Sequence, residues 1–277
     1  MAESMLEIVL RRDRFIVAVA LAVLTLLAWI YVLWLVAAMD MGGMDMSGLR
    51  MVPAVFAIME PATAPWTASE FAYVFVMWAV MMVGMMTPSA APMILIYARV
   101  GRQASAEGKP LAATGWFATG YLLAWVGFSL AATAGQWALQ RAALLDSMMA
   151  GTSHMFAAIV LITAGVYQWA PLKDACLAHC QSPVLFIHRH GGFKPASSDS
   201  LRLGLRHGAY CVGCCWALMA LLFVGGIMNV LWIAAISAFT LIEKIVPAGH
   251  LLSRAAGICF AAAGVWLAIA LGGITKI

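Results

Sequence analysis

The chain has 277 residues, of which 64% are hydrophobic and 10% charged, and its mean hydropathy is +0.95. This balance excludes a water-soluble globular protein. The net charge of +4 is spread over polar segments with no basic cluster between aromatic residues, so we expect no nucleic-acid partner.

Seven apolar segments approach the roughly 20 residues that a helix needs to cross a bilayer. They predict an all-α fold, a polytopic transmembrane helix bundle that forms one domain over residues 1–277. The fourth and sixth segments are short, and the break at GGIMN leaves open six spans plus a re-entrant hairpin. The segments are 15–38, 70–97, 112–136, 154–170, 207–228, 230–246 and 251–272.

The positively charged residues predict the orientation in the membrane. With the N-terminus inside, thirteen of the sixteen Lys and Arg fall in inner segments, and only Arg50, Arg141 and Lys276 fall outside. By the positive-inside rule the protein is N-in and C-out in a bacterial inner membrane. Residues 39–69 then form an outer loop, and residues 171–206 form a cytoplasmic loop of linker composition.

The outer loop contains the stretch MDMGGMDMSG, in which methionines alternate with aspartates and glycines. Because such a non-periodic segment has no core to fill, its thioethers and carboxylates are typical of a capture segment for a soft cation. A linker without function is the alternative.

The second span carries a row of methionines. Met77, Met81 and Met85 recur every four residues, and Met82 and Met86 run beside them, so the thioethers form a stripe about 13 Å long. Thioether is a good ligand for Cu(I) and a poor one for hard ions. Simple packing, for which methionine is also suited, is the alternative. Pro88 and Pro92 further along predict a kink, with the hydroxyls of Thr87 and Ser89 near the freed carbonyls.

Two matching motifs lie at the predicted inner ends of the fourth and fifth spans. Both place three donors at i, i+3 and i+4, which is one face of a helix. Thiolate and imidazole are the donors that Zn(II) and Cu(I) prefer, so the repeated spacing predicts a shared metal site. The candidate ligands are Cys176, His179 and Cys180 in the first motif, Cys211, Cys214 and Cys215 in the second, and His207 one turn before Cys211.

Other interpretations of these residues stay open. The cysteines can pack as small apolar residues, hold a structural zinc ion, or, at the vicinal Cys214 and Cys215, perform thiol redox chemistry. Cys259 in the last span is expected to be buried as a small apolar residue. His188 and His190 are expected on a solvated or interfacial loop, and Glu243 with Lys244 are expected to reach the interface or to form ion pairs.

The segments MWAVMMVGMMTPSAAP, CLAHCQSP and RLGLRHGAYCVGCCWALMALLFVGGIMN resemble the bacterial family described as predicted metal-binding integral membrane proteins, a domain of unknown function. The resemblance covers residues 70–250 and does not include the outer loop. It implies a membrane protein that binds metal, without naming a reaction.

The order of the donors predicts the function. Methionines outside, methionines along the second span and a Cys/His cluster inside favour Cu(I) transport or delivery to a membrane metalloenzyme. The alternatives are a non-catalytic membrane subunit or scaffold with a structural zinc site, and a thiol-redox or cofactor-bearing enzyme subunit. A homo-oligomer is possible, and the absence of a nucleotide loop, nucleophile elbow or carboxylate pair favours a non-enzymatic role.

Overall fold

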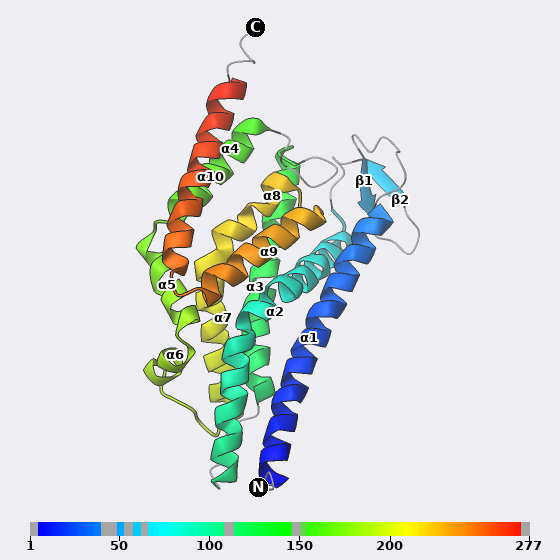
Figure 1. Ribbon diagram of the computed structural model, residues 1–277. Coiled ribbons are helices and arrows are strands. Elements are labelled where there is room, and N and C mark those ends of the chain that lie inside the picture. Colours follow the sequence, from blue (N-terminus) through cyan, green and yellow to red (C-terminus); the bar gives the residue numbers. More distant parts are fainter. Residues whose placement is uncertain are drawn as a thin grey trace.

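The computed structural model describes residues 5–39, 49–52, 58–61, 66–107, 114–145, 151 and 153–272 (Figure 1). Its elements form an all-α bundle with one short β-hairpin at its side. They are α1 (Met5–Met39), β1 (Leu49–Val52), β2 (Ile58–Pro61), α2 (Ala68–Ala106), α3 (Thr114–Arg141), α4 (His154–Tyr167), α5 (Pro171–Gln181), α6 (Pro183–Arg189), α7 (Ser197–Ala220), α8 (Leu222–Gly225), α9 (Val230–Ile245) and α10 (Gly249–Gly272).

Five helices among the described residues are long and apolar enough to cross a membrane, fewer than the seven segments expected. They comprise α1, α2, α3, α7 with α8, and α10, and a sixth span is possible if α4 and α5 are taken together. These two helices bend by 64° at their junction, because Pro171 starts a new helix. The segment expected at 230–246 is α9, which has 16 residues and is capped at Asn229. The protein is therefore a membrane protein in which one predicted span is bent and another is short.

The predicted cytoplasmic loop is largely helical. Residues 171–206 form α5, α6 and the first turns of α7, with Pro171 and Pro183 each in the first turn of a helix. The first cysteine motif consequently lies on the separate helix α5 and not on the end of the fourth span. In the outer loop, β1 and β2 pair antiparallel, with Leu49 opposite Pro61. The methionine and aspartate side chains of that loop lie outside the described residues.

The helices α3 and α7 pack backbone to backbone at glycines. A Cβ at Gly204 would lie 2.0 Å from the Phe117 carbonyl oxygen, and a Cβ at Gly120 would lie 2.1 Å from the Leu201 carbonyl oxygen. Only glycine permits such an approach, as in other membrane bundles. The close packing places Tyr121 of α3 against α7.

The helix α2 continues through both internal prolines, and its ribbon bends along its length (Figure 1). Hydroxyl groups bind the backbone before Pro88. Ser89 and Tyr121 donate to the Met86 carbonyl, and Ser237 donates to the Met85 carbonyl at 3.2 Å. The Thr87 hydroxyl, expected to help here, is buried and has no partner among the described residues.

The beginning of α1 and the end of α10 lie at opposite ends of the bundle (Figure 1). The end of α2 lies at the same end as the beginning of α1, as does the connection between α6 and α7. Parts of three predicted inner segments therefore share one end of the molecule, whereas the connection between α9 and α10 lies about midway along the bundle (Figure 1). Which side of a membrane that end faces stays a prediction.

Candidate metal centre

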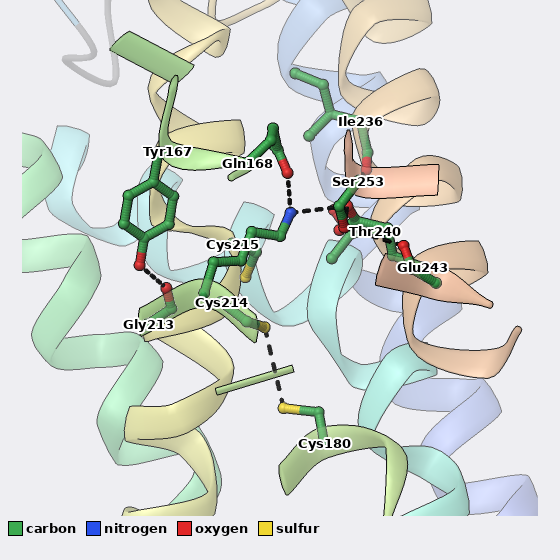
Figure 2. Close-up of polar contacts among 12 residues, drawn as sticks. Tyr167, Gln168, Cys180, Gly213, Cys214, Cys215, Ile236, Thr240, Glu243 and Ser253 are labelled. Atoms are coloured by element: carbon green, nitrogen blue, oxygen red, sulfur yellow. Dashed lines mark hydrogen bonds and ion pairs between the residues drawn. The ribbon is translucent and has the colours of Figure 1, made fainter. Parts of the chain in front are cut away.

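Two cysteine thiols from different helices face each other inside the bundle. The Sγ atoms of Cys180, on α5, and Cys214, on α7, are 4.0 Å apart (Figure 2). Two metal–sulfur bonds of about 2.3 Å, the length of zinc–thiolate bonds, span this separation at an S–metal–S angle of roughly 120°. The separation therefore fits one soft metal ion between two thiolates, with room for a third donor in the same plane.

Cys211 is the third thiol of this cluster. Its side chain is buried and interacts with the thiols of Cys180 and Cys214. The Lys244 Nζ, on α9, donates to the Cys211 Sγ at 2.9 Å, and the Tyr121 hydroxyl lies 3.2 Å from the same sulfur. The thiol cluster, defined as Cys180, Cys211 and Cys214, thus has a buried ammonium group at one edge.

The partners of Cys211 close a ring of hydrogen bonds. The Lys244 Nζ also donates to the Ser89 Oγ at 3.1 Å, and the Ser89 hydroxyl donates to the Met86 carbonyl at 2.9 Å. The Tyr121 hydroxyl donates to the same carbonyl at 3.0 Å. Because the ring joins α2, α3, α7 and α9, it fixes the ammonium group against the sulfur.

The other two donors of the α5 motif lie elsewhere. Cys176 packs against the backbone of α7, where a Cβ at Gly213 would lie 2.8 Å from its Sγ. His179 stacks on Tyr210, with the ring centroids 4.3 Å apart and the planes at 4°. Of the first motif, Cys180 is the member whose Sγ contacts a thiol sulfur of α7.

Two more predicted donors on α7 are buried beside the cluster. The Cys215 thiol donates to the Cys211 carbonyl at 2.8 Å. The His207 ring packs near those of Phe117 and Tyr121, and its Nδ1 has no hydrogen-bond partner within the described part of the chain. A buried polar atom without a partner is costly, so the His207 Nδ1 is a donor or acceptor that the described residues leave unsatisfied.

No group of three or more His, Cys, Asp or Glu side chains, within the residues described, is arranged to hold a metal ion as it stands. Cys211 is the nearest third donor, but its sulfur is engaged by Lys244 and Tyr121. A third sulfur ligand from Cys211 would therefore require its side chain to leave Lys244 and Tyr121 and turn toward the other two thiols.

The methionine row lies in the same buried core as the thiols of α7. Each of its five members is at most 2% exposed, and all five belong to one hydrophobic cluster with Cys211, Cys214 and Cys215. The row reaches the thiol cluster through the Met86 carbonyl, which Tyr121 joins to Cys211. Cys259, expected to be buried, is exposed on α10, because that helix is covered on one side only.

A buried ion pair supports α5 next to the cluster. Lys173 on α5 pairs with Glu243 on α9 at 2.7 Å, and both side chains are at most 2% exposed. Ser253 donates to the same carboxylate, and Lys173 also donates to Gln168 (Figure 2). Sequence reasoning expected a pairing or interfacial role for Glu243 but did not identify Lys173. The sequence signal that could have identified Lys173 was the position of a charged residue at the junction of two apolar segments.

A family model described as "PpoB2: Copper chaperone" matches residues 75–267, well over half of the chain. This range contains the methionine row and both cysteine motifs and leaves out the outer loop. No curated protein and no solved structure matches the chain.

Proposed function

The chain belongs to the PpoB2 copper chaperone family, and from this premise we propose that it holds Cu(I) on the thiol cluster and delivers it to a partner metalloenzyme. The observation that carries the proposal is the 4.0 Å separation of Cys180 and Cys214, which come from different helices. Thiols brought together across an interface between helices form a site that neither helix has alone.

The number of available donors favours Cu(I) over zinc. A structural zinc site takes four ligands in a tetrahedron, whereas Cu(I) is stable with two or three soft ligands. Cys176 packs against α7 and His179 stacks on Tyr210, and of the four motif thiols that remain, Cys180 and Cys214 face each other across the two helices. A four-ligand zinc site that recruits His207 is the second candidate, because the His207 Nδ1 has no partner among the described residues.

Lys244 supplies the charge balance of the cluster. One Cu(I) ion on two thiolates, with the third sulfur as a neutral thiol, carries a net charge of −1, which is costly inside an apolar bundle. An ammonium group in contact with Cys211 neutralises that charge. The same contact holds the site together when copper is absent.

The methionine row provides a weaker set of soft ligands that ends at the thiol cluster. With the N-in orientation, copper captured outside by the Met/Asp loop moves along α2 to the thiols and is released on the cytoplasmic side. The direction follows the increase in ligand strength from thioether to thiolate. The inner membrane, a metalloenzyme acceptor and a homo-oligomeric form belong to this proposal.

The test is an anaerobic Cu(I) titration of the full-length protein in nanodiscs against a competing chelator, with X-ray absorption to identify ligands. We expect one tightly bound Cu(I) on two or three sulfurs, lost in C180S/C214S and retained in C259S, whose thiol is exposed on α10. Retention of sulfur-bound copper by C180S/C214S would refute the assignment. Four ligands, one of them nitrogen, around zinc would favour the structural zinc site instead.

A further inference from the structure

We infer that His179 and His190 form a second Cu(I) site, a two-imidazole port through which copper enters or leaves the thiol cluster. The inference rests on the proposed function and extends it, since the two histidines lie outside the thiol cluster. His190, expected on a solvated or interfacial loop, is the C-cap residue just after α6 and packs at 4.4 Å from the Phe186 ring.

Both imidazoles are oriented as metal-binding histidines usually are. The His179 Nδ1 is 2.7 Å from the Ala175 carbonyl, and the His190 Nδ1 is 2.8 Å from the Phe186 carbonyl, each four residues earlier. A carbonyl accepts, so each Nδ1 carries a proton, and in a neutral imidazole of this tautomer Nε2 is the nitrogen with the lone pair. A backbone partner that fixes the tautomer is the usual second contact of a metal-bound histidine.

The spacing of the two rings fits a single ion. Their centroids are 5.9 Å apart. Two metal–nitrogen bonds of about 2 Å on opposite sides of one ion, plus the distance from each nitrogen to its ring centre, give roughly 6 Å. Both rings also contact Tyr210, which holds them on one side of α7.

The pair lies between the surface and the thiols. His190 lines a cavity of about 160 Å³ together with Lys194, Arg202 and Arg206, with Asp199 as its acidic group. On the other side, Tyr210 precedes Cys214 by four residues, about 6 Å along α7. His179 is also the neighbour of Cys180 in the chain. Copper on the imidazoles is therefore one helical turn from the thiol pair.

The charge of the cavity defines the carrier that can use the port. Three cations against one carboxylate repel a free copper cation and attract an anionic complex. We therefore assign the cavity to a carrier that holds Cu(I) in a complex of net negative charge. Imidazole binds Cu(I) less strongly than thiolate, as a transfer ligand must.

The experiment isolates the port by removing the thiol pair. C180S/C214S protein in nanodiscs is loaded anaerobically with one equivalent of Cu(I), and its ligands are identified by X-ray absorption. We expect copper on two nitrogens, lost when H179N and H190N are added and retained when H188N is added. The asparagine side chain has an N–H group that can take the place of the histidine Nδ1–H, but it has no counterpart of Nε2. His188, the control, is an exposed histidine of α6.

A kinetic measurement covers the protein with intact cysteines. H179N/H190N should load its thiols at least tenfold more slowly from an anionic Cu(I) chelate, with the same final occupancy, whereas H188N should load at the normal rate. Nitrogen-bound copper that persists in H179N/H190N, or an unchanged loading rate, would overturn the port. Absence of sulfur-bound copper from the wild-type protein would instead refute the proposed function, so the two failures are distinguishable.

Discussion

Replacing Lys244 by methionine tests whether the ammonium group stabilises bound copper. In the structure the Nζ lies 2.9 Å from the Cys211 Sγ and 3.1 Å from the Ser89 Oγ. Methionine has a similar length and no charge, so the bundle should remain packed. If Lys244 balances the copper–thiolate charge, the substitution weakens Cu(I) binding without removing any sulfur ligand.

The expected loss follows from the contact distance. Two unit charges 2.9 Å apart in an effective dielectric of about 20 interact by roughly 6 kcal/mol. This is an upper bound, because the negative charge of the copper site is centred on the other two sulfurs and because burying the ammonium group has its own cost. Hydrogen bonds to charged groups contribute about 1.5–3 kcal/mol net. We therefore expect Lys244→Met to weaken Cu(I) binding by about 10- to 150-fold.

The assay is chelator competition for Cu(I) with the variant in nanodiscs, after size-exclusion chromatography has shown that it is folded. Arg254→Met is the control, since it removes a partly exposed charge paired with Asp174 at 3.2 Å and should change the affinity by less than about threefold. A folded Lys244→Met protein that binds Cu(I) as tightly as the wild type would refute the charge-balance argument. Tighter binding would also contradict the argument, and an added sulfur ligand in the X-ray absorption spectrum would show that the introduced thioether binds copper.

Three further variants test the methionine row, the buried ion pair between Lys173 and Glu243, and the glycine contact between α3 and α7. Met81→Leu with Met85→Leu keeps volume and should cost less than about 1.5 kcal/mol in stability, while copper delivery in cells falls and direct loading of purified protein is normal. Glu243→Gln leaves Lys173 buried without its partner and should lower the free energy of unfolding by about 3–5 kcal/mol, measured by denaturation in detergent. Gly204→Ala places a methyl 2.0 Å from a backbone oxygen of α3 and should destabilise the bundle by about 1–3 kcal/mol.

Each of these variants has a matched comparison. Met155→Leu changes an exposed methionine on α4 and should leave delivery intact, and normal delivery by the double methionine variant would make the row a packing feature. For the ion pair, replacing both partners by apolar residues should recover part of the loss. Gly127→Ala adds a methyl where no atom lies within 4 Å, so an equal loss there would contradict the close-packing argument.

Composition and hydropathy were sufficient to predict the helical membrane fold, because apolar length directly measures the ability to cross a bilayer. They did not predict the 64° turn after α4 or the helices within 171–206. Residues 171–206 contain polar groups typical of loops, yet Pro171 and Pro183 serve as helix starts. A proline next to an apolar segment does not by itself show whether a loop follows that segment or a new helix begins.

The repeated spacing of the cysteine motifs predicted a shared site and treated all members of a motif alike, and the structure brings one residue of each motif, Cys180 and Cys214, into contact across α5 and α7. Spacing fixes the face of a helix and leaves its rotation open. In the structure that rotation turns Cys180 toward Cys214 and His179 toward Tyr210. The sequence did not predict the contact between Lys244 and the Cys211 sulfur, because the residue pattern of α9 does not show which side chains of other helices pack against it.

The separation of thiol and imidazole donors has a mechanistic consequence. If all six donors of the two motifs converged, copper would be held too strongly to be passed on, since each added thiolate slows release. In the proposed assignment, three thiols beside an ammonium group and two imidazoles one turn away instead form a strong site with a weaker one on its route to the surface. Copper can then move by exchanging one ligand at a time, and no step leaves the ion bare inside the bundle. Retention and release thus follow from how α5 is rotated against α7.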